Sequence, residues 1–376
     1  MSALRFPKIY AVVLLVFGLV FVFSGLVINF LQLCSLALWP LNKNLYRKVN
    51  CLLTYSFWSQ LIVLLEWWSG SECNLFTDQN SVDKIGKEQA IVIFNHTFEI
   101  DVFCVWTLCE RYGILGSSKV LAKKELLYVP VIGWVWYFQE SIFCTRKWEE
   151  DKHGLVEDLS RLADYPEPLG FLLSCEGTRF TEEKHRISME VAESKGLPKL
   201  KYHLLPRTKG FTTVVQCLRG KASAVYDVTL NFRGRQNPSL LGLVRREKYK
   251  ADMCFRRIPL EEIPLDDNEI AKWLHELYQE KDALQEFYNQ TGIFPGEQIK
   301  PRRRPWALFN FFFWATAILF SLFKLTFVIF LSGSPLLILI FFGFLGGALF
   351  GIQRLVGVTE IQKSSTYGNQ EFKKRG

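Results

Sequence analysis

Long apolar stretches at both ends of the chain enclose a central part in which apolar and polar positions alternate. The first apolar run extends from Ile9 to Trp39 and is almost uncharged. As a helix it would reach about 46 Å, longer than the roughly 30 Å hydrocarbon core of a bilayer. It has no small-residue cleavage site of the kind that ends a signal peptide. We therefore expect an uncleaved membrane anchor, either tilted or bent near Gly25 or Asn29.

A second apolar stretch, from Leu52 to Trp68, is interrupted by two polar residues, Gln60 and Glu66. It ends in a pair of tryptophans, and aromatic side chains of this kind are typical of the membrane–water boundary. We expect this segment to be a helix that lies at the membrane interface rather than one that spans the bilayer.

Two more apolar stretches near the C-terminus predict a transmembrane hairpin. They extend from Trp306 to Leu331 and from Leu336 to Phe350, and a Ser-Gly-Ser-Pro sequence between them is a strong turn signal. Arg302–Arg304 precede the first stretch and Arg354 follows the second. The positive-inside rule therefore places both ends of the hairpin in the cytosol.

Between the membrane segments, short apolar strands alternate with amphipathic helices. Strands are predicted at Ala90–Phe94, Lys119–Ala122, Ser141–Cys144, Leu169–Ser174, Lys201–Leu205, Ser223–Phe232 and Ala251–Ile258. Helices are predicted at Asp101–Tyr112, Glu149–Ala163, Glu182–Lys195 and Asp267–Thr291. This alternation indicates an α/β domain with one central sheet and helices on its faces.

These patterns divide the chain into four parts. The predicted parts are an N-terminal membrane anchor with an interfacial helix (1–70), a cytosolic α/β domain (71–300), a transmembrane hairpin (301–356) and a cytosolic tail (357–376).

Composition narrows the class of partner. The 49% apolar content and 32 phenylalanines exceed what a soluble core of this size needs, which agrees with membrane segments. The net charge of +8 suits an anionic membrane surface and phosphate-bearing substrates. Nucleic acid is not expected, because the basic residues are not interleaved with aromatic ones. The nine cysteines form no C-x-x-C pair, so neither a metal site nor a disulfide framework is indicated, and reduced thiols facing the cytosol fit best.

The first candidate for chemistry follows the predicted strand Ala90–Phe94. His96 and Asp101 stand five positions apart, and on one continuous helix their side chains would point about 140° apart. They can meet only if His96 precedes the helix and Asp101 lies in its first turn, where the helix dipole favours a carboxylate. Asp101 would then accept the imidazole N–H and leave the other ring nitrogen free as a general base.

Two alternatives to this interpretation remain open. His96 can be a structural histidine beside an N-capping Asp101, which on these residues alone is about as plausible as a general base. Asn95-His96-Thr97 is also an acceptor sequence for N-glycosylation, but it leaves an apolar strand rather than a luminal surface loop.

A second candidate follows the apolar strand Leu169–Ser174 and reads Cys175-Glu176-Gly177-Thr178-Arg179. Its backbone can bend at the glycine, and its amides and hydroxyl are donors. The guanidinium of Arg179 suits bidentate capture of a phosphate. Cys175 could also serve as a nucleophile with His96 as its base, although a buried, unreactive thiol is the more plausible state.

Together, His-x4-Asp and Glu-Gly-Thr-Arg, about 75 residues apart, resemble the first and third motifs of the glycerolipid acyltransferases. Within that group they resemble the 1-acylglycerol-3-phosphate (lysophosphatidic acid) acyltransferases. The segment 122–126, with Pro130 and Gly133 following, resembles the stretch that leads into the second motif. Ile142–Arg146 resembles the second motif itself, with Arg146 as its arginine. Leu204-Leu205-Pro206 is similar to the fourth, a strand that ends in proline. One departure is that Ser174-Cys175 stands where the family has Phe-Pro, which bears on head-group preference rather than on the chemistry.

The resemblance implies a central mixed sheet flanked by helices and a defined reaction. An acyl group would pass from acyl-CoA to the sn-2 hydroxyl of 1-acylglycerol 3-phosphate, giving phosphatidic acid and free CoA for phospholipid and triacylglycerol synthesis. No cofactor or metal is expected, since acyl-CoA is a co-substrate, and transfer would be direct, without an acyl-enzyme.

The same resemblance assigns roles to individual residues. His96 would act as the base and Asp101 would fix its tautomer and stabilise the imidazolium. Arg179, with Arg146 and Lys123, would clamp the phosphate of the acceptor. Glu176, Gly177 and Thr178 would shape the loop and its donors.

The other histidines and basic clusters are expected to be structural or solvated. His153, His185, His203 and His275 lack an acid at a useful spacing in the sequence. Lys184-His185-Arg186 and the basic piece 245–248 are expected to be solvated surface, with contact to a coenzyme phosphate or an anionic lipid as the less favoured alternative.

Two other functions compete with this interpretation. The acceptor could be another lysophospholipid, such as lysophosphatidylcholine or lysophosphatidylinositol. The chain could instead be a non-catalytic membrane scaffold, although a scaffold has no need of both an intact Arg146 and Glu-Gly-Thr-Arg.

Two lysines near the C-terminus bear on location. Lys373 and Lys374 stand at the fourth- and third-last positions, as in a dilysine signal for return to the endoplasmic reticulum, which works only on a cytosolic tail. We expect a multi-pass protein of the endoplasmic reticulum membrane, and also of the Golgi, with its catalytic domain in the cytosol.

Overall fold

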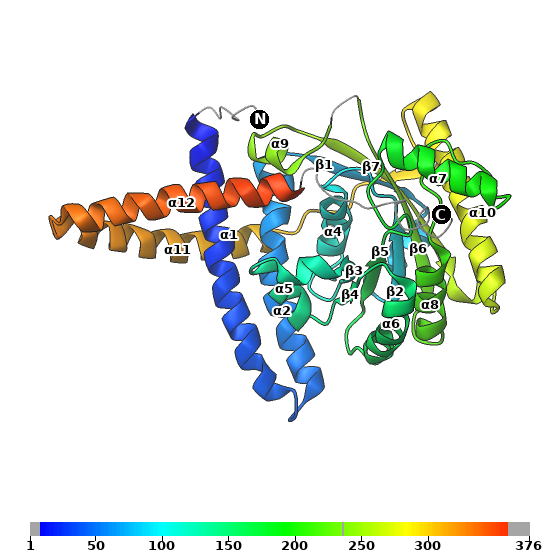
Figure 1. Cartoon of the computed structure of the whole chain (residues 1–376), viewed down its shortest axis with the longest axis horizontal. Helices are drawn as coiled ribbons and strands as arrows, with labels where there is room; N and C mark the ends of the chain where they lie inside the picture. Colours follow the sequence, from blue (N-terminus) through cyan, green and yellow to red (C-terminus); the bar gives the residue numbers. More distant parts are fainter. Residues whose placement is uncertain (1–7, 235–236, 360–376) are drawn as a thin grey trace, which may run out of the picture.

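The computed structural model describes residues 8–234 and 237–359, and a mixed sheet of eight strands forms the centre of this part (Figure 1). The spatial order is β4-β3-β5-β2-β6-β7-β1-β8. The five strands from β4 to β6 are parallel, β7 is antiparallel to β6, β1 is parallel to β7, and β8 is antiparallel to β1. The strands are β1 Glu72–Thr77, β2 Ala90–Phe94, β3 Lys119–Lys123, β4 Ile142–Cys144, β5 Gly170–Leu173, β6 Ala224–Phe232, β7 Lys250–Pro259 and β8 Glu297–Ile299.

Alternation along the buried strands builds a separate hydrophobic core on each face of the sheet. In β2, Val92 and Phe94 join the core beneath α2 and α4, whereas Ile91 and Ile93 join the core beneath α6, α8 and α10. The helices on the two faces are α2 Lys43–Ile62, α4 Asp101–Arg111, α5 Ile132–Phe138, α6 Trp148–Leu162, α8 Thr208–Leu218 and α10 Asp267–Thr291. Shorter segments are α3 Gln79–Lys84, α7 Glu182–Ser194 and α9 Leu240–Val244. The predicted class, a mixed sheet flanked by helices, is confirmed.

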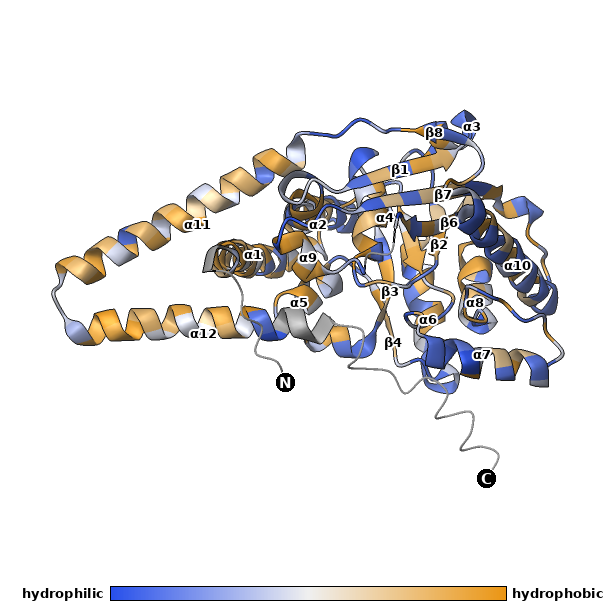
Figure 2. Ribbon diagram, turned by 90° about the horizontal axis from the view of Figure 1, so that it is seen from above, coloured by the Kyte–Doolittle hydropathy of each residue, from blue (hydrophilic) through white to orange (hydrophobic). Residues whose placement is uncertain are grey.

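Four helices in the described residues are long and apolar enough to cross a membrane. They are α1 Lys8–Ser35, α2 with its π-helical extension Val63–Trp68, α11 Trp306–Leu331 and α12 Pro335–Thr359. The last two form the predicted hairpin, which extends away from the sheet and runs crosswise to α1 (Figures 1 and 2).

The helix α1 continues without interruption through Gly25 and Asn29, near which a bend was the expected alternative to a tilt, and ends at Ser35. The glycine serves close packing instead, because a Cβ there would lie 2.3 Å from Val131 Cγ1 and 2.7 Å from a ring carbon of Phe57. Gly25 is therefore a contact point between α1 and the globular part.

The second apolar segment begins earlier than expected, at Lys43, and packs between α1 and the sheet. Its polar residues explain this arrangement. Arg47 is buried and pairs with Glu140 at 2.8 Å, and Tyr55 donates to Glu110 at 2.9 Å. The helix is therefore tied to the α/β domain along its length, and its position at the membrane interface stays a prediction.

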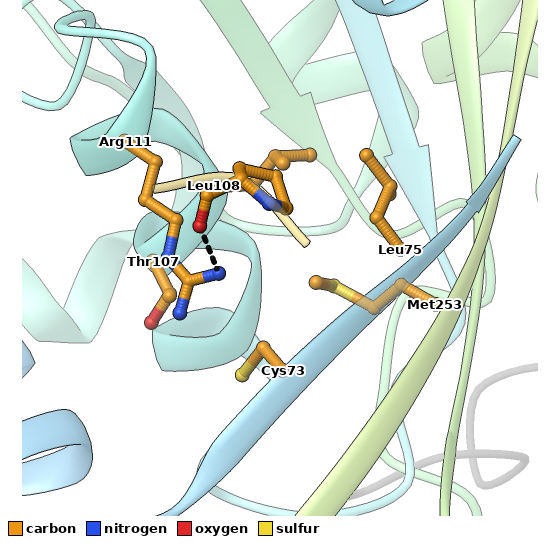
Figure 3. A pocket seen from close by; sticks show the side chains of 7 residues that line it. Cys73, Leu75, Thr107, Leu108, Arg111 and Met253 are labelled. Atoms are coloured by element: carbon orange, nitrogen blue, oxygen red, sulfur yellow. Dashed lines mark hydrogen bonds between the residues drawn. The ribbon is translucent and has the colours of Figure 1, made fainter. Parts of the chain in front are cut away.

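The arginines that precede the hairpin also bond to the α/β domain. Arg303 donates to the backbone oxygen of Glu66 at 3.0 Å, and Arg304 to that of Glu110 at 2.8 Å. Arg111 pairs with the buried Glu66 and donates to the backbone oxygen of Pro301 at 3.1 Å (Figure 3). The crevice there is lined by Cys73, Leu75, Thr107, Leu108, Arg111, Met253 and Pro301. Two of the three linker arginines therefore bond to the globular part, and their role in membrane topology stays a prediction.

One predicted strand, Lys201–Leu205, is wrong. The backbone N–H groups of Lys201 and Tyr202 donate to the side chain of Asp282 at 2.8 and 2.7 Å, and that of Leu205 donates to Ser188 Oγ at 2.8 Å. Side-chain acceptors thus take the donors that a neighbouring strand would have used. The sequence also gave no indication of β1, β8, α5 or α8.

Candidate active site

The His96 and Asp101 side chains meet at the turn between β2 and α4. Asp101 is the first residue of α4, and His96 lies five residues earlier, before the helix begins. His96 Nδ1 lies 3.1 Å from Asp101 Oδ2. The imidazole is 20% exposed and the carboxylate 2% exposed, so Asp101 is shielded from solvent whereas His96 is accessible from outside. The ring nitrogen that remains, Nε2, is available for a proton.

Local backbone bonds explain why the carboxylate adopts this position. Asp101 Oδ2 also accepts the backbone N–H groups of Thr97 at 2.6 Å and Phe98 at 2.7 Å. The turn therefore folds around the carboxylate, and the same oxygen orients the imidazole. A carboxylate in the first turn of α4 is further stabilised by the helix dipole.

The Glu-Gly-Thr-Arg turn follows β5, the strand that pairs with β2 in the sheet. The N–H of Gly177 donates to the backbone oxygen of Ser174 at 3.0 Å, which closes a tight turn. Gly177 has φ 69°, a left-handed conformation that favours glycine. A Cβ at this position would lie 2.9 Å from Arg207 Cδ and Nε, so the glycine also makes room for the Arg207 side chain.

The two turns are joined directly. The backbone N–H of Phe180 donates to the backbone oxygen of His96 at 2.8 Å. Partial burial lowers the pKa of Arg179, while the negative charges of Glu99 and Asp101 act in the opposite direction. Because both acidic residues belong to the histidine turn, the Arg179 guanidinium lies within electrostatic range of that turn. The adjacent parallel strands thus bring the His96–Asp101 pair and the Arg179 guanidinium to the same edge of the sheet.

More cations gather beside this edge. Lys184, in the first turn of α7, donates to Thr178 Oγ1 at 3.0 Å and to the backbone oxygen of Arg179 at 3.1 Å. Arg146 is exposed directly after β4, and its pKa is lowered by partial desolvation and by the like charge of Arg207. The cations Arg146, Arg179, Lys184 and Arg207 therefore surround the Glu-Gly-Thr-Arg turn.

Arg146 adopts a left-handed backbone, with φ 65°. A side chain in this region costs about 1–2 kcal/mol, and such strain concentrates at functional sites. Lys123 differs from Arg146 because its ammonium pairs with Glu125 at 3.0 Å. A phosphate would therefore meet a partly neutralised charge at Lys123.

Two of these cations were not predicted. Lys184 belongs to a basic cluster expected at the solvated surface, with contact to a coenzyme phosphate or an anionic lipid as the less favoured alternative, and Arg207 is not among the candidate residues of the sequence. Arg207 follows Pro206 of the fourth motif, and its backbone N–H donates to the oxygen of Cys175 at 2.7 Å. The position directly after the proline was the one signal that could have indicated it.

Two side chains of the second turn point into the protein. Glu176 is 1% exposed, and burial raises its pKa well above the usual range. Lys281 and the backbone amides of His96 and Leu204 offset only part of this effect. Glu176 thus lies behind the turn rather than on its open side. Cys175 is buried, and burial raises the pKa of its thiol, which opposes the nucleophile alternative.

Of the other histidines, His203 departs from the expectation that none has an acidic partner. His203 does have an acidic partner, since its Nδ1 lies 3.1 Å from Asp282 Oδ1 on α10, far away in the sequence. It is 2% exposed, and burial lowers its pKa, so it acts as a neutral, structural group. Within the part of the chain that the structure describes, no group of three or more His, Cys, Asp or Glu residues could hold a metal.

Comparison with known proteins defines the class. Residues 75–233, which include both turns, match the model of the Acyltransferase family, and residues 242–314 match that of the Acyltransferase C-terminus. The chain is 68% identical over 375 residues to 1-acyl-sn-glycerol-3-phosphate acyltransferase gamma of Homo sapiens and 67% identical to that of Mus musculus, covering 100% of each chain. It is 57% identical over 361 residues to the delta enzyme of Homo sapiens, covering 96% of both.

These similarities are family-defining, and the chain belongs to the 1-acyl-sn-glycerol-3-phosphate acyltransferases, a family of enzymes. Segments outside the motifs, such as Leu64–Trp68 and Tyr226–Phe232, also suggest the vertebrate gamma type, and the identities above agree with this. A 1-acyl-sn-glycerophosphate acyltransferase from Thermotoga maritima also matches, with 16% identity, a TM-score of 0.45, and coverage of 74% of this chain and 97% of the other.

Proposed function

We propose that the chain transfers an acyl group from acyl-CoA to the sn-2 hydroxyl of 1-acylglycerol 3-phosphate. The products are phosphatidic acid and free CoA. The observation that carries this proposal is the position of the His96–Asp101 pair, 3.1 Å apart and open on one side, next to a cluster of cations. A base beside an anion-binding turn suits an acceptor that holds a hydroxyl and a phosphate in one small molecule.

His96 begins the reaction by taking the proton of the acceptor hydroxyl on Nε2. The oxygen then forms a bond to the thioester carbonyl carbon, the bond from that carbon to sulfur breaks, and the imidazolium returns the proton to the departing thiolate. Asp101 holds the N–H on Nδ1 and stabilises the imidazolium. The hydrogen bonds from the backbone N–H groups of Thr97 and Phe98 to Asp101 Oδ2 hold the carboxylate in this orientation before the substrate binds. This preorganisation lowers the free-energy cost of reaching the transition state.

The cations orient the acceptor through its phosphate. The Arg179 guanidinium feels the charges of Glu99 and Asp101 in the histidine turn. Arg146 feels the like charge of Arg207, whose side chain lies against Gly177. Lys184 holds the turn through Thr178, so its main role is positioning. Lys123 contributes less because of Glu125. Glu176, Gly177 and Thr178 set the shape of the turn.

The membrane and both amphiphilic substrates are the expected partners. The four apolar helices keep the site at a surface where lysophosphatidic acid and acyl-CoA gather. The location we propose is the endoplasmic reticulum membrane, with the Golgi as a second one and the catalytic domain in the cytosol. Lys373 and Lys374, on which part of this rests, lie outside the described residues.

The test is acyl transfer by the purified full-length protein in micelles. Labelled oleoyl-CoA is supplied with lysophosphatidic acid, lysophosphatidylcholine or lysophosphatidylinositol. Wild type is compared with His96→Ala and with His153→Ala, which removes an exposed histidine on α6. The proposal predicts transfer to lysophosphatidic acid that His96→Ala abolishes and His153→Ala retains.

Other outcomes would redirect the proposal. Transfer to a different acceptor, still dependent on His96, would keep the chemistry and overturn the head-group assignment. No transfer to any acceptor by folded protein would support the scaffold function instead.

A further inference from the structure

The chain makes an excursion between β3 and β4, two neighbouring parallel strands, and this excursion exposes large aromatic side chains. It comprises the 3₁₀ turn Lys124–Tyr128 and the helix α5. Tyr128 is 73% exposed, Trp134 53% and Tyr137 60%. These three exposed rings stand within 15 consecutive residues, 124–138, and are called the aromatic surface below. Exposed apolar groups gathered in one segment are typical of an interaction site.

The inner side of the excursion is held firmly, so the exposure is not a result of loose packing. Val135 and Phe138 of α5 are buried. Tyr46 on α2 donates to the backbone oxygen of Phe138 at 2.8 Å. The Arg47 guanidinium makes two bonds to Glu140, at 2.8 and 2.9 Å. Trp134 and Tyr137, three residues apart on α5, therefore lie on a face of this helix that the described residues leave exposed.

The excursion is also fixed to α1. Val131 has φ 67° and ψ −59°, and the N–H of Ile132 donates to the backbone oxygen of Pro130 at 2.8 Å. A β-branched residue is rarely found in such a three-residue turn with positive φ. The Val131 side chain fills the space left by the missing Cβ of Gly25. The strained turn at Val131 therefore holds the aromatic surface beside α1.

The neighbours of this surface identify its partner. Figure 2 shows α5 beside α1, in the part of the molecule from which the hairpin extends, with α10 at the opposite end. On α1 itself, Leu26 is 51% exposed and Phe30 63%. Tyrosine and tryptophan are the residues that favour the head-group level of a bilayer, where the ring is buried and its polar atom stays hydrated. The aromatic surface thus continues the apolar surface of a candidate membrane helix.

We propose that Tyr128, Trp134 and Tyr137 form a membrane-docking surface that inserts into the head-group region of a phospholipid monolayer. This goes beyond the proposed reaction and does not depend on the acceptor. Lys123 is the last residue before the excursion, and Arg146 follows two residues after the strand that ends it. Insertion of the aromatic rings therefore sets the height at which these cations meet lipid phosphates.

The first test measures hydroxyl-radical labelling of the full-length protein reconstituted in phosphatidylcholine vesicles. Phe287, on α10, serves as an internal control because it is an aromatic residue that is 42% exposed. The proposal predicts that Trp134 and Tyr137 are labelled severalfold more slowly than Phe287, although they are more exposed in the protein. Labelling of both residues faster than Phe287 would overturn it, whether or not the protein shows transferase activity.

The second test measures kinetics with lysophosphatidic acid presented in vesicles. The double variant Trp134→Ser, Tyr137→Ser is compared with Leu265→Ser, which removes an apolar side chain that is 73% exposed just before α10. The double variant should raise KM severalfold for lysophosphatidic acid in vesicles. With a short-chain, monomeric acceptor its kcat should stay unchanged. Leu265→Ser should change neither of these two constants. An unchanged KM, or an equal loss with both acceptors, would contradict docking by these rings.

Discussion

The turns after β2 and β5 lie side by side at one edge of the sheet, yet they use their acidic residues in opposite ways. One carboxylate oxygen of Asp101 accepts hydrogen bonds from two backbone N–H groups, at 2.6 and 2.7 Å, and lies 3.1 Å from the His96 imidazole nitrogen. Glu176 is buried behind its turn, where desolvation raises its pKa, and the outer side of that turn presents cations. We therefore propose that the turn after β2 serves proton transfer and the turn after β5 serves anion binding.

Replacing His96 by alanine should have the largest effect. General-base catalysis contributes about 10²–10⁴-fold, so kcat should fall by about that factor. The measurement is steady-state turnover of lysophosphatidic acid. Since the imidazole is partly exposed, the thermal midpoint of the variant should stay near that of wild type. Near-normal kcat would show that the first turn does not carry the base.

Asp101→Asn should give the second-largest loss. An amide retains an acceptor for Thr97 and Phe98 but cannot stabilise an imidazolium, so kcat should fall by about 10²-fold. The pH dependence of kcat/KM separates this role from a structural one. A catalytic Asp101 requires a changed profile in the variant, whereas uniformly lower activity with an unchanged profile would indicate only a damaged turn.

Arg179→Ala should affect binding more than turnover. A hydrogen bond to a charged group is worth about 1.5–3 kcal/mol, so KM for lysophosphatidic acid should rise roughly tenfold to a hundredfold. Arg179→Lys, which keeps the charge but loses the bidentate geometry, should give a smaller rise. Equal KM values for wild type and Arg179→Ala would assign the phosphate to other residues.

Gly177→Ala should cost about 1–2 kcal/mol of stability, because the new side chain must adopt φ 69°. The added Cβ would also displace Arg207, so KM for the acceptor should rise more than kcat falls. Gly154→Ala is the control, since a Cβ there meets no atom within 4 Å and φ is not positive. The thermal midpoints of the two variants in micelles measure the difference.

The smallest effect concerns acid stability beneath the second turn. Burial alone would raise the pKa of Asp227, but Lys281 at 2.5 Å and Arg256 at 2.6 Å hold this pKa below that of an ordinary aspartate, about 3.9. Its contribution to stability is therefore present above about pH 3.9 and is lost as pH falls through the lower, folded-state pKa. The thermal midpoint should then decline below pH 4. A midpoint that is constant down to pH 3 would contradict the ion-pair assignment.

Sequence patterns indicated the elements with local signals and missed those that depend on distant partners. The helix stripe predicted α10 with its observed bounds, and His96 and Asp101 share a turn that their spacing made possible. The supposed strand Lys201–Leu205 failed because its amides bond to Asp282, which only the folded chain brings near. Lys184 and Arg207 were not predicted because neither is among the motif residues, although Lys184 stands only six residues after Thr178, which it contacts.

The catalytic coupling between His96 and Asp101 can be measured directly with a double-mutant cycle. The measurement is kcat for lysophosphatidic acid with wild type, His96→Ala, Asp101→Asn and the double variant, all as folded protein in micelles. If Asp101 acts only through the imidazole, the double variant will be no slower than His96→Ala alone. If the two losses multiply in the double variant, the residues act independently and the proposed pair is wrong.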